Sequence, residues 1–85
     1  MRIKVASLFE KNYKKLPKRI KEKAKEKEMI FRNNPFDTRL KTHKLKGKQC
    51  QSWAFWINNS YRIKFLFISS DEVLFLDIGT HEIYK

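Results

Sequence analysis

The sequence predicts an α+β fold of two layers, in which an N-terminal helical hairpin packs on a small antiparallel sheet in the order β-α-α-β-β-β. Two observations predict this class. Apolar residues recur with the period of a helix between residues 9 and 31, and with a period of two from residue 53 onward. The 85 residues suffice for a single domain, 1–85, whose thin core draws on 7 Phe, 3 Tyr and 2 Trp.

The first half of the chain is typical of a short strand followed by two helices. Residues 3–5 (IKV) are the strand candidate, and Ser7 with Glu10 matches a capping box at a helix start. Pro17 favours a break between two helices, and NNPFD ends the second one, because the residue before Pro35 is pushed out of the α region. One apolar stripe at helical spacing predicts the packed face of the hairpin: Phe9, Tyr13, Leu16, Ile20, Ala24 and Phe31.

The second half predicts three antiparallel strands, WAFWI, YRIKFLFI and VLFLDI, separated by the turn segments NNS and SSDE. Alternation along the middle strand assigns its residues to two faces. One face takes Tyr61, Ile63, Phe65 and Phe67, and the other takes Arg62, Lys64, Leu66 and Ile68. The second face is therefore basic at one end.

Charge is the strongest compositional signal, with 20 Lys and Arg against 9 Asp and Glu. Residues 1–48 hold 17 basic and 5 acidic side chains, a balance of +12, whereas residues 49–85 hold 3 and 4, a balance of −1. Interleaved glutamates make KRIKEKAKEKE partly a solubilising helix surface, but RLKTHKLKGK contains no acid. A partner that carries negative charge is expected.

The cellular location of the protein is predicted from features that the sequence lacks. Cys50 is the one cysteine, so no disulfide or cysteine-based metal framework is expected, and the simplest interpretation of this thiol is a small structural residue in a reducing compartment. No signal peptide and no apolar run long enough for a membrane span is recognised. We expect a soluble, cytoplasmic protein.

Five segments together resemble a known family: KKLPK, NPF, HKLKG, YRIKF and DIGTHEIYK. Their order and spacing are similar to those of the RelE/ParE superfamily of bacterial toxins from toxin–antitoxin systems, and most closely to its YafQ-like branch of mRNA interferases. The likeness covers nearly the whole chain. It implies a compact α+β fold, cleavage of mRNA in the ribosomal A site without a metal or other cofactor, and neutralisation by a cognate antitoxin.

Metal-free RNA cleavage uses the ribose 2′-OH as nucleophile, so it needs a base, an acid for the departing 5′-oxygen, and cations for the phosphate. His43 and His81, the only histidines, both fall inside the matching segments. The resemblance assigns Arg62 to phosphate binding, and Tyr84 to stacking on a base or donating its hydroxyl. Four further residues are predicted to bind RNA: Lys41, Lys44, Lys46 and Trp56.

Several of these residues have a second interpretation. Lys44 and Lys46 suit general electrostatic anchoring better than catalysis. Arg62 could form a structural ion pair with Asp77, which is otherwise a candidate supporting residue behind the site. His81, so near the end of the chain, could be a solvated side chain.

The sequence also departs from the family pattern. Trp56 stands where many relatives have arginine or histidine, and Ser60 stands near an acid of the closest branch, which puts the strength of catalysis in doubt. Trp56 could stack on a nucleotide or merely fill the sheet surface. Two other functions stay open: a ParE-like inhibitor of DNA gyrase, and a toxin-derived module that only binds RNA or an antitoxin.

Overall fold

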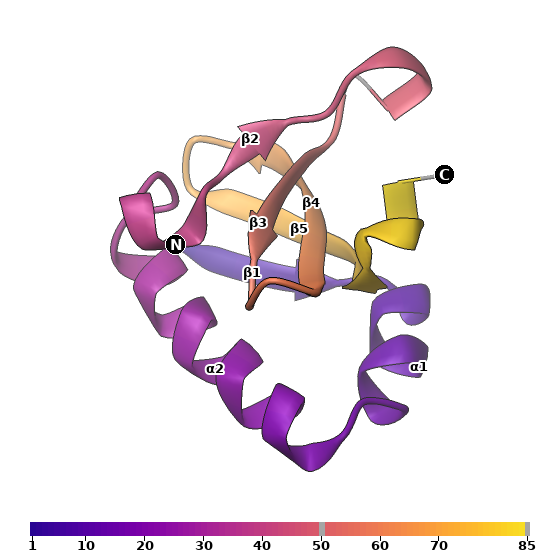
Figure 1. Cartoon of the computed structure of the whole chain (residues 1–85). Coiled ribbons are helices and arrows are strands. Elements are labelled where there is room, and N and C mark those ends of the chain that lie inside the picture. The colour runs from indigo at the N-terminus through magenta and orange to yellow at the C-terminus, as the bar shows by residue number, and fades with distance from the viewer. Residues whose placement is uncertain (50, 85) are drawn as a thin grey trace.

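The structure is a computed structural model that describes residues 1–49 and 51–84, with Gln49 and Tyr84 described by their backbone only. Five strands form one sheet in the order β1-β5-β4-β3-β2, and both helices lie on the same side of it (Figure 1). The predicted α+β fold is confirmed. The elements are β1 (Arg2–Val5), α1 (Ser7–Lys14), α2 (Lys18–Asn33), β2 (His43–Lys44), β3 (Trp53–Trp56), β4 (Tyr61–Ser69) and β5 (Glu72–Thr80), with short 3-10 turns η1 (Thr38–Leu40), η2 (Gly47–Gln49) and η3 (His81–Tyr84). The prediction for Cys50 falls outside the described residues.

The sheet differs from the predicted one in two details. β1 joins β5 in parallel, with Ile3 opposite Val73, so the sheet is mixed. His43 and Lys44 add the short strand β2, which pairs antiparallel with β3. A strand of two residues is too short to show a period of two, which is why the sequence pattern missed it.

The core lies between the helices and the sheet, and Phe31 is its centre. This ring near the end of α2 has no exposed surface, and it lies 4.8 Å from the ring of Phe55, 5.0 Å from that of Phe65 and 5.6 Å from that of Phe75. One helix residue therefore packs on three neighbouring strands, β3, β4 and β5. Phe9, Ile20 and Ala24 are also buried, which confirms the predicted stripe.

The start of the first helix differs from the prediction. Ala6 occupies the N-cap position with an extended backbone, Ser7 is already helical, and no side chain caps the helix. A capping box requires the hydroxyl at the cap position itself, so the Ser7 and Glu10 prediction is wrong by one residue. The predicted break at Pro17 is confirmed, because Pro17 is the N-cap of α2 and its carbonyl accepts from Ile20 N at 3.0 Å. Within the described part of the chain, no helix combines the length and apolar character that a membrane span needs.

Candidate functional site

The sheet face turned away from the helices gathers most of the predicted site. Residues that pair directly across antiparallel strands project from the same face. His43 pairs with Ala54, and Ala54 with Lys64, which makes one row across β2, β3 and β4. In the next row Trp56 pairs with Arg62, and Arg62 with Gly79. We call this surface the open face.

Trp56 and Arg62 are in direct contact on the open face. The guanidinium carbon of Arg62 lies 3.8 Å from the centroid of the Trp56 ring, and the amine of Lys41 lies 4.2 Å from the same centroid. Arg62 comes from β4 and Lys41 from the segment before β2, so the two cations reach the indole from opposite sides of β3. A desolvated contact of this kind contributes about 2 kcal/mol.

Backbone carbonyls hold Arg62 from the other side. Its Nη1 donates to the carbonyl of Asn58 at 2.7 Å and to that of Tyr61 at 3.1 Å, and the residue is only 8% exposed. Among the described residues no ion pair joins Arg62 to Asp77. Asp77 instead accepts from the Asn12 side chain of α1 at 2.7 Å. The cation of Arg62 is thus fixed in place, and no carboxylate of the described residues forms an ion pair with it.

His43 is exposed, and its tautomer follows from one contact. Its Nδ1 lies 3.0 Å from the carbonyl oxygen of Lys41. A carbonyl can only accept, so Nδ1 donates, and in the neutral ring the lone pair then belongs to Nε2. Lys41 has a left-handed backbone, with φ of 53°, at the end of η1. This turn brings the carbonyl to His43, while the Lys41 side chain covers Trp56.

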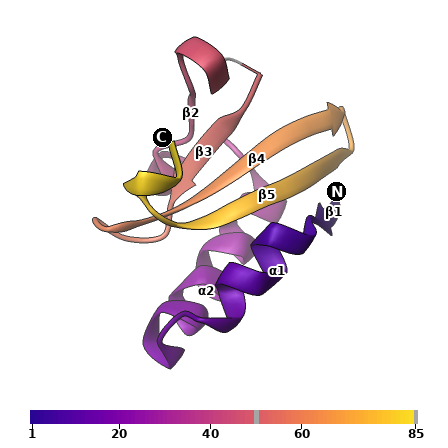
Figure 2. The same cartoon turned by 90° about the vertical axis from the view of Figure 1, so that its right-hand side faces the viewer.

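His81 lies at the margin of the open face, in η3. Figure 2 shows η3 on the side of the sheet opposite the two helices. A Cβ added to Gly79 would lie 2.9 Å from Cγ2 of Ile83, so the absent side chain of Gly79 lets Ile83 pack against β5. Because Gly79 pairs with Arg62, η3 folds back beside the Arg62 row. His81 is exposed there, whereas the predicted side chain of Tyr84 lies outside the described part of the structure.

The two lysines of the KLKG segment are placed differently from His43. Lys44 pairs with Trp53, so alternation directs it to the face opposite the one that carries His43. Lys46 is exposed in the segment before η2, and Leu45 between them is buried. Neither lysine joins the Trp56 and Arg62 contacts, so the structure does not bring either of them into the centre of the open face.

Solved structures show which known proteins share this architecture. YafQ from E. coli strain BL21(DE3) superposes with a TM-score of 0.79 at 22% identity, covering 98% of this chain and 97% of that one. A YoeB/ParE toxin from Agrobacterium tumefaciens gives 0.79 at 19% identity, with 95% and 99% covered. The chain has the RelE/ParE toxin fold. The YafQ of the E. coli DinJ–YafQ toxin–antitoxin complex also matches, with a TM-score of 0.76 at 21% identity over 95% of this chain and 92% of that one.

No family model matches the sequence, and no curated protein matches it by sequence either. The likeness therefore concerns the fold. As far as the fold is concerned, it confirms the resemblance to the RelE/ParE superfamily that the five sequence segments indicated. The recurrence of YafQ among the similar structures agrees with the branch to which those segments pointed.

Three residues that shape the open face were not predicted from the sequence. Asn58 holds Arg62 through its backbone carbonyl, which no side-chain pattern reveals. Gly79 and Ile83 fix η3, and their signal was a glycine four residues before an apolar residue near the end of the chain. Residues 1–49 and 51–84 contain no group of three His, Cys, Asp or Glu residues that could hold a metal ion.

Proposed function

We propose that this chain is the toxin of a type II toxin–antitoxin pair, and that it cleaves mRNA on the ribosome through the ribose 2′-OH. The observation that carries the proposal is the open face, on which a fixed arginine, the indole ring that it contacts and an imidazole come together. YafQ and the YoeB/ParE toxin, which share the fold, support the toxin assignment.

The chemistry requires an attack on the scissile phosphate in line with the leaving oxygen. We assign His43 as the base that takes the 2′-OH proton, because its Nδ1 contact leaves the lone pair on Nε2. The 2′-oxygen bonds to phosphorus, the bond to the 5′-oxygen breaks, and the products are a 2′,3′-cyclic phosphate and a free 5′-OH. His81 is assigned as the acid that protonates the departing 5′-oxygen.

Charge develops on the phosphate oxygens during this attack, and Arg62 is assigned to stabilise it. A cation held by two carbonyls and an indole needs no reorganisation at the moment of reaction, which is the condition for strong electrostatic catalysis. Trp56 can offer the edge of its ring to a neighbouring base, and Tyr84 is assigned to stack on a base or donate its hydroxyl.

The ribosome supplies the positioning that the small open face lacks. Free RNA is expected to bind weakly and with little sequence preference, and to be cut slowly, because nothing else aligns the 2′-OH with the scissile bond. The second proposed partner is an acidic antitoxin that covers the helices and the HKLKG segment. The DinJ–YafQ complex supports a partner of this class.

His81→Ala tests the proposal on ribosomes programmed with mRNA. The single-turnover cleavage rate should fall by about 10²-fold or more if the imidazole transfers a proton. Thr80→Ala is the control, because it shortens an exposed side chain at the same end of β5. His43→Ala should impair cleavage as well, and the wild-type rate should follow a bell-shaped pH profile that belongs to the pair.

Three results of expression in cells separate the candidate functions. Discrete cuts in translated mRNA support the proposal, DNA damage without cuts indicates a gyrase inhibitor, and neither effect indicates a binding module. Cleavage by His81→Ala at the wild-type rate would show that the C-terminal turn takes no part in the chemistry. Tyr84→Phe then separates stacking, which survives, from hydrogen bonding, which does not.

A further inference from the structure

A groove runs along α2, on the side of the helix that faces the turn between β3 and β4. Its larger part has a volume of about 370 Å³, and a second hollow of about 300 Å³ continues it toward the start of α2. The two hollows share Lys23 and Asn58, so they form one surface, which we call the α2 groove. None of the sequence patterns pointed to it.

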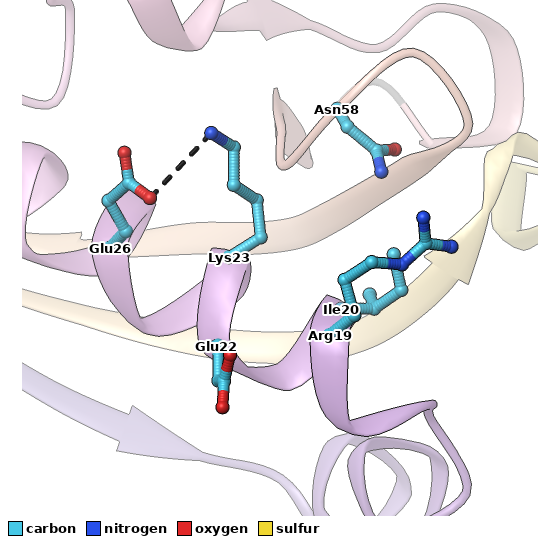
Figure 3. Close-up of a pocket in the computed structure, with 6 residues that line it drawn as sticks. All are labelled: Arg19, Ile20, Glu22, Lys23, Glu26 and Asn58. Carbon is cyan, nitrogen blue, oxygen red and sulfur yellow. Dashed lines mark ion pairs between the residues drawn. The ribbon is translucent and has the colours of Figure 1, made fainter.

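Cations line the α2 groove at regular intervals. Arg19, Lys23 and Lys27 are spaced by four residues and so lie on one face of α2, and Arg39 of η1 adds a fourth cation at the far end. In Figure 3 the guanidinium of Arg19 extends to the side of α2 that faces the turn, and the amide nitrogen of Asn58 points down toward the helix. All of these groups are potential hydrogen-bond donors.

Three carboxylates near the α2 groove offset this charge only in part. Figure 3 shows Glu22 directed away from the turn. Glu26 pairs with Lys23 at 3.6 Å, but both side chains are exposed, by 61% and 43%, and such pairs contribute little. Asp37 pairs with Arg39 at 2.9 Å and orients its guanidinium. Among the described residues Lys27 has no ion-pair partner.

The α2 groove is continuous with the open face. Trp56 lines the larger hollow and also carries the Arg62 contact, so one indole belongs to both surfaces. Asn58 lines both hollows, and its carbonyl holds Arg62 at 2.7 Å. The Asn58 side chain also accepts from the amides of Ser60 and Tyr61 at 2.8 Å, which fixes the turn between the two surfaces.

The lining favours a phosphodiester over a peptide. A helical peptide needs apolar anchors in its groove, and the two isoleucines here, Ile20 and Ile57, are 2% and 0% exposed and offer none. Cations and an amide donor along a polar groove suit phosphate oxygens, which need charge and donors but no shape-specific pocket. We propose that the α2 groove is a second RNA-binding surface, which holds the backbone of the chain that leaves the open face past Trp56. This inference rests on the proposed function.

A binding experiment without cleavage tests it. The probe is a labelled single strand of about 12 nucleotides with 2′-O-methyl riboses, which cannot be cut, and its affinity is measured by anisotropy over a range of salt. The groove variant is Lys23→Gln with Lys27→Gln. The control is Lys18→Gln with Lys25→Gln, which removes the same charge from exposed positions on the opposite face of α2.

The groove variant should weaken binding by about tenfold and reduce the slope of log affinity against log salt by about 1.4, since each phosphate contact on a single strand contributes about 0.7. The control should leave the slope unchanged. Equal losses in both variants would overturn the proposal and show that only total charge matters. If the groove variant keeps its affinity for RNA but binds a poly-glutamate peptide more weakly, the proposal is overturned and the groove is assigned to an acidic protein segment.

Ribosomal cleavage by the same variants keeps the two proposals separate. If the wild-type protein cuts mRNA on the ribosome but both variants bind the probe equally, the α2 groove proposal is ruled out and the proposed function is retained. If the wild-type protein binds the probe through the groove but never cuts mRNA, the proposed function is ruled out and the α2 groove remains an RNA-binding surface. Thermal unfolding of both variants checks that the fold is intact.

Discussion

The two halves of this chain carry positive charge in different ways. Residues 1–48 hold 17 cations and 5 acids, and their cations lie mainly on exposed helix and turn surfaces. Residues 49–85 hold only 3 cations, yet one of these is Arg62, which is 8% exposed and held by an indole and two carbonyls. The first half therefore presents many separate exposed cations, whereas the second half holds one cation, Arg62, at a defined point.

The largest expected effect comes from removing the fixed cation of Arg62. Arg62→Gln should lower the single-turnover cleavage rate on ribosomes by about 10²- to 10³-fold, as loss of a preorganised donor does. It should also lower the free energy of unfolding by about 1–3 kcal/mol, because the carbonyl of Asn58 loses the Arg62 donor, whereas that of Tyr61 keeps the amide of Ile57. Urea unfolding checks the second value.

Lys46→Gln is the matched control, since it removes one charge from an exposed position. It should change the cleavage rate only severalfold. Arg62→Lys sharpens the comparison, because it keeps the charge but loses the planar fork. Equal activity of Arg62→Lys and wild type would show that charge alone, and not its fixed placement, matters at this position.

A second prediction concerns a substitution that displaces His81 without changing any charge. Gly79→Ala would place a methyl group 2.9 Å from Cγ2 of Ile83, and the stiff β-branched side chain cannot turn away. The turn η3 should shift, and with it His81, so the cleavage rate should fall by about tenfold for a small misplacement of this kind. Stability should change little, because η3 contributes few core residues.

Ile83→Ala tests the cause of that loss. The double variant Gly79→Ala with Ile83→Ala should recover activity toward that of Ile83→Ala alone, since the methyl group then has room. A double variant that shows the summed losses of the two single variants would mean that Gly79 acts in some other way.

A third prediction concerns the exposed half. If an acidic antitoxin is the partner, its association rate should fall by about tenfold as salt rises from low to physiological ionic strength, because exposed charges are screened over about 8–10 Å. Stopped-flow mixing measures the rate. Arg62→Gln should leave this salt dependence unchanged, whereas neutralising two exposed lysines of α2 should reduce it. An association rate indifferent to salt would contradict the role given to residues 1–48.

Patterns that repeat along the chain were predictable, and single contacts were not. The helix stripe through Phe31 and the alternation through Ile63 and Phe65 each repeat several times, so a period can be recognised, and both were confirmed. The capping box at Ser7 failed because a shift of one residue changes which group occupies the cap. β2 was missed because two residues carry no period.

The candidate site shows the same limit. The sequence predicted that Arg62 lies on the face of its strand opposite Ile63 and Phe65, and the burial of those two residues in the core agrees with this. It could not predict that Trp56 would hold Arg62 and Lys41 together, because Lys41 lies 15 positions earlier and reaches the indole only through a left-handed turn. Long-range contacts of this kind depend on the packed chain and have no local signature.

The smallest expected effect belongs to an ion pair of the exposed half, and it tests how firmly Arg39 is held in the α2 groove. The hydrogen bond from the Arg39 side chain is the main cause that lowers the pKa of Asp37 from 3.8 to about 2. A carboxyl whose pKa is lower in the folded state adds stability above its unfolded pKa, and this stability is lost as the pH falls from about 3.8 toward 2. An NMR titration of the Asp37 carboxyl should give a midpoint near 2, and Arg39→Gln should return the midpoint toward 3.8. An Asp37 midpoint of 3.8 in the wild-type protein would mean that the pair does not persist in solution, and that Arg39 enters the groove as a mobile cation like its lysine neighbours.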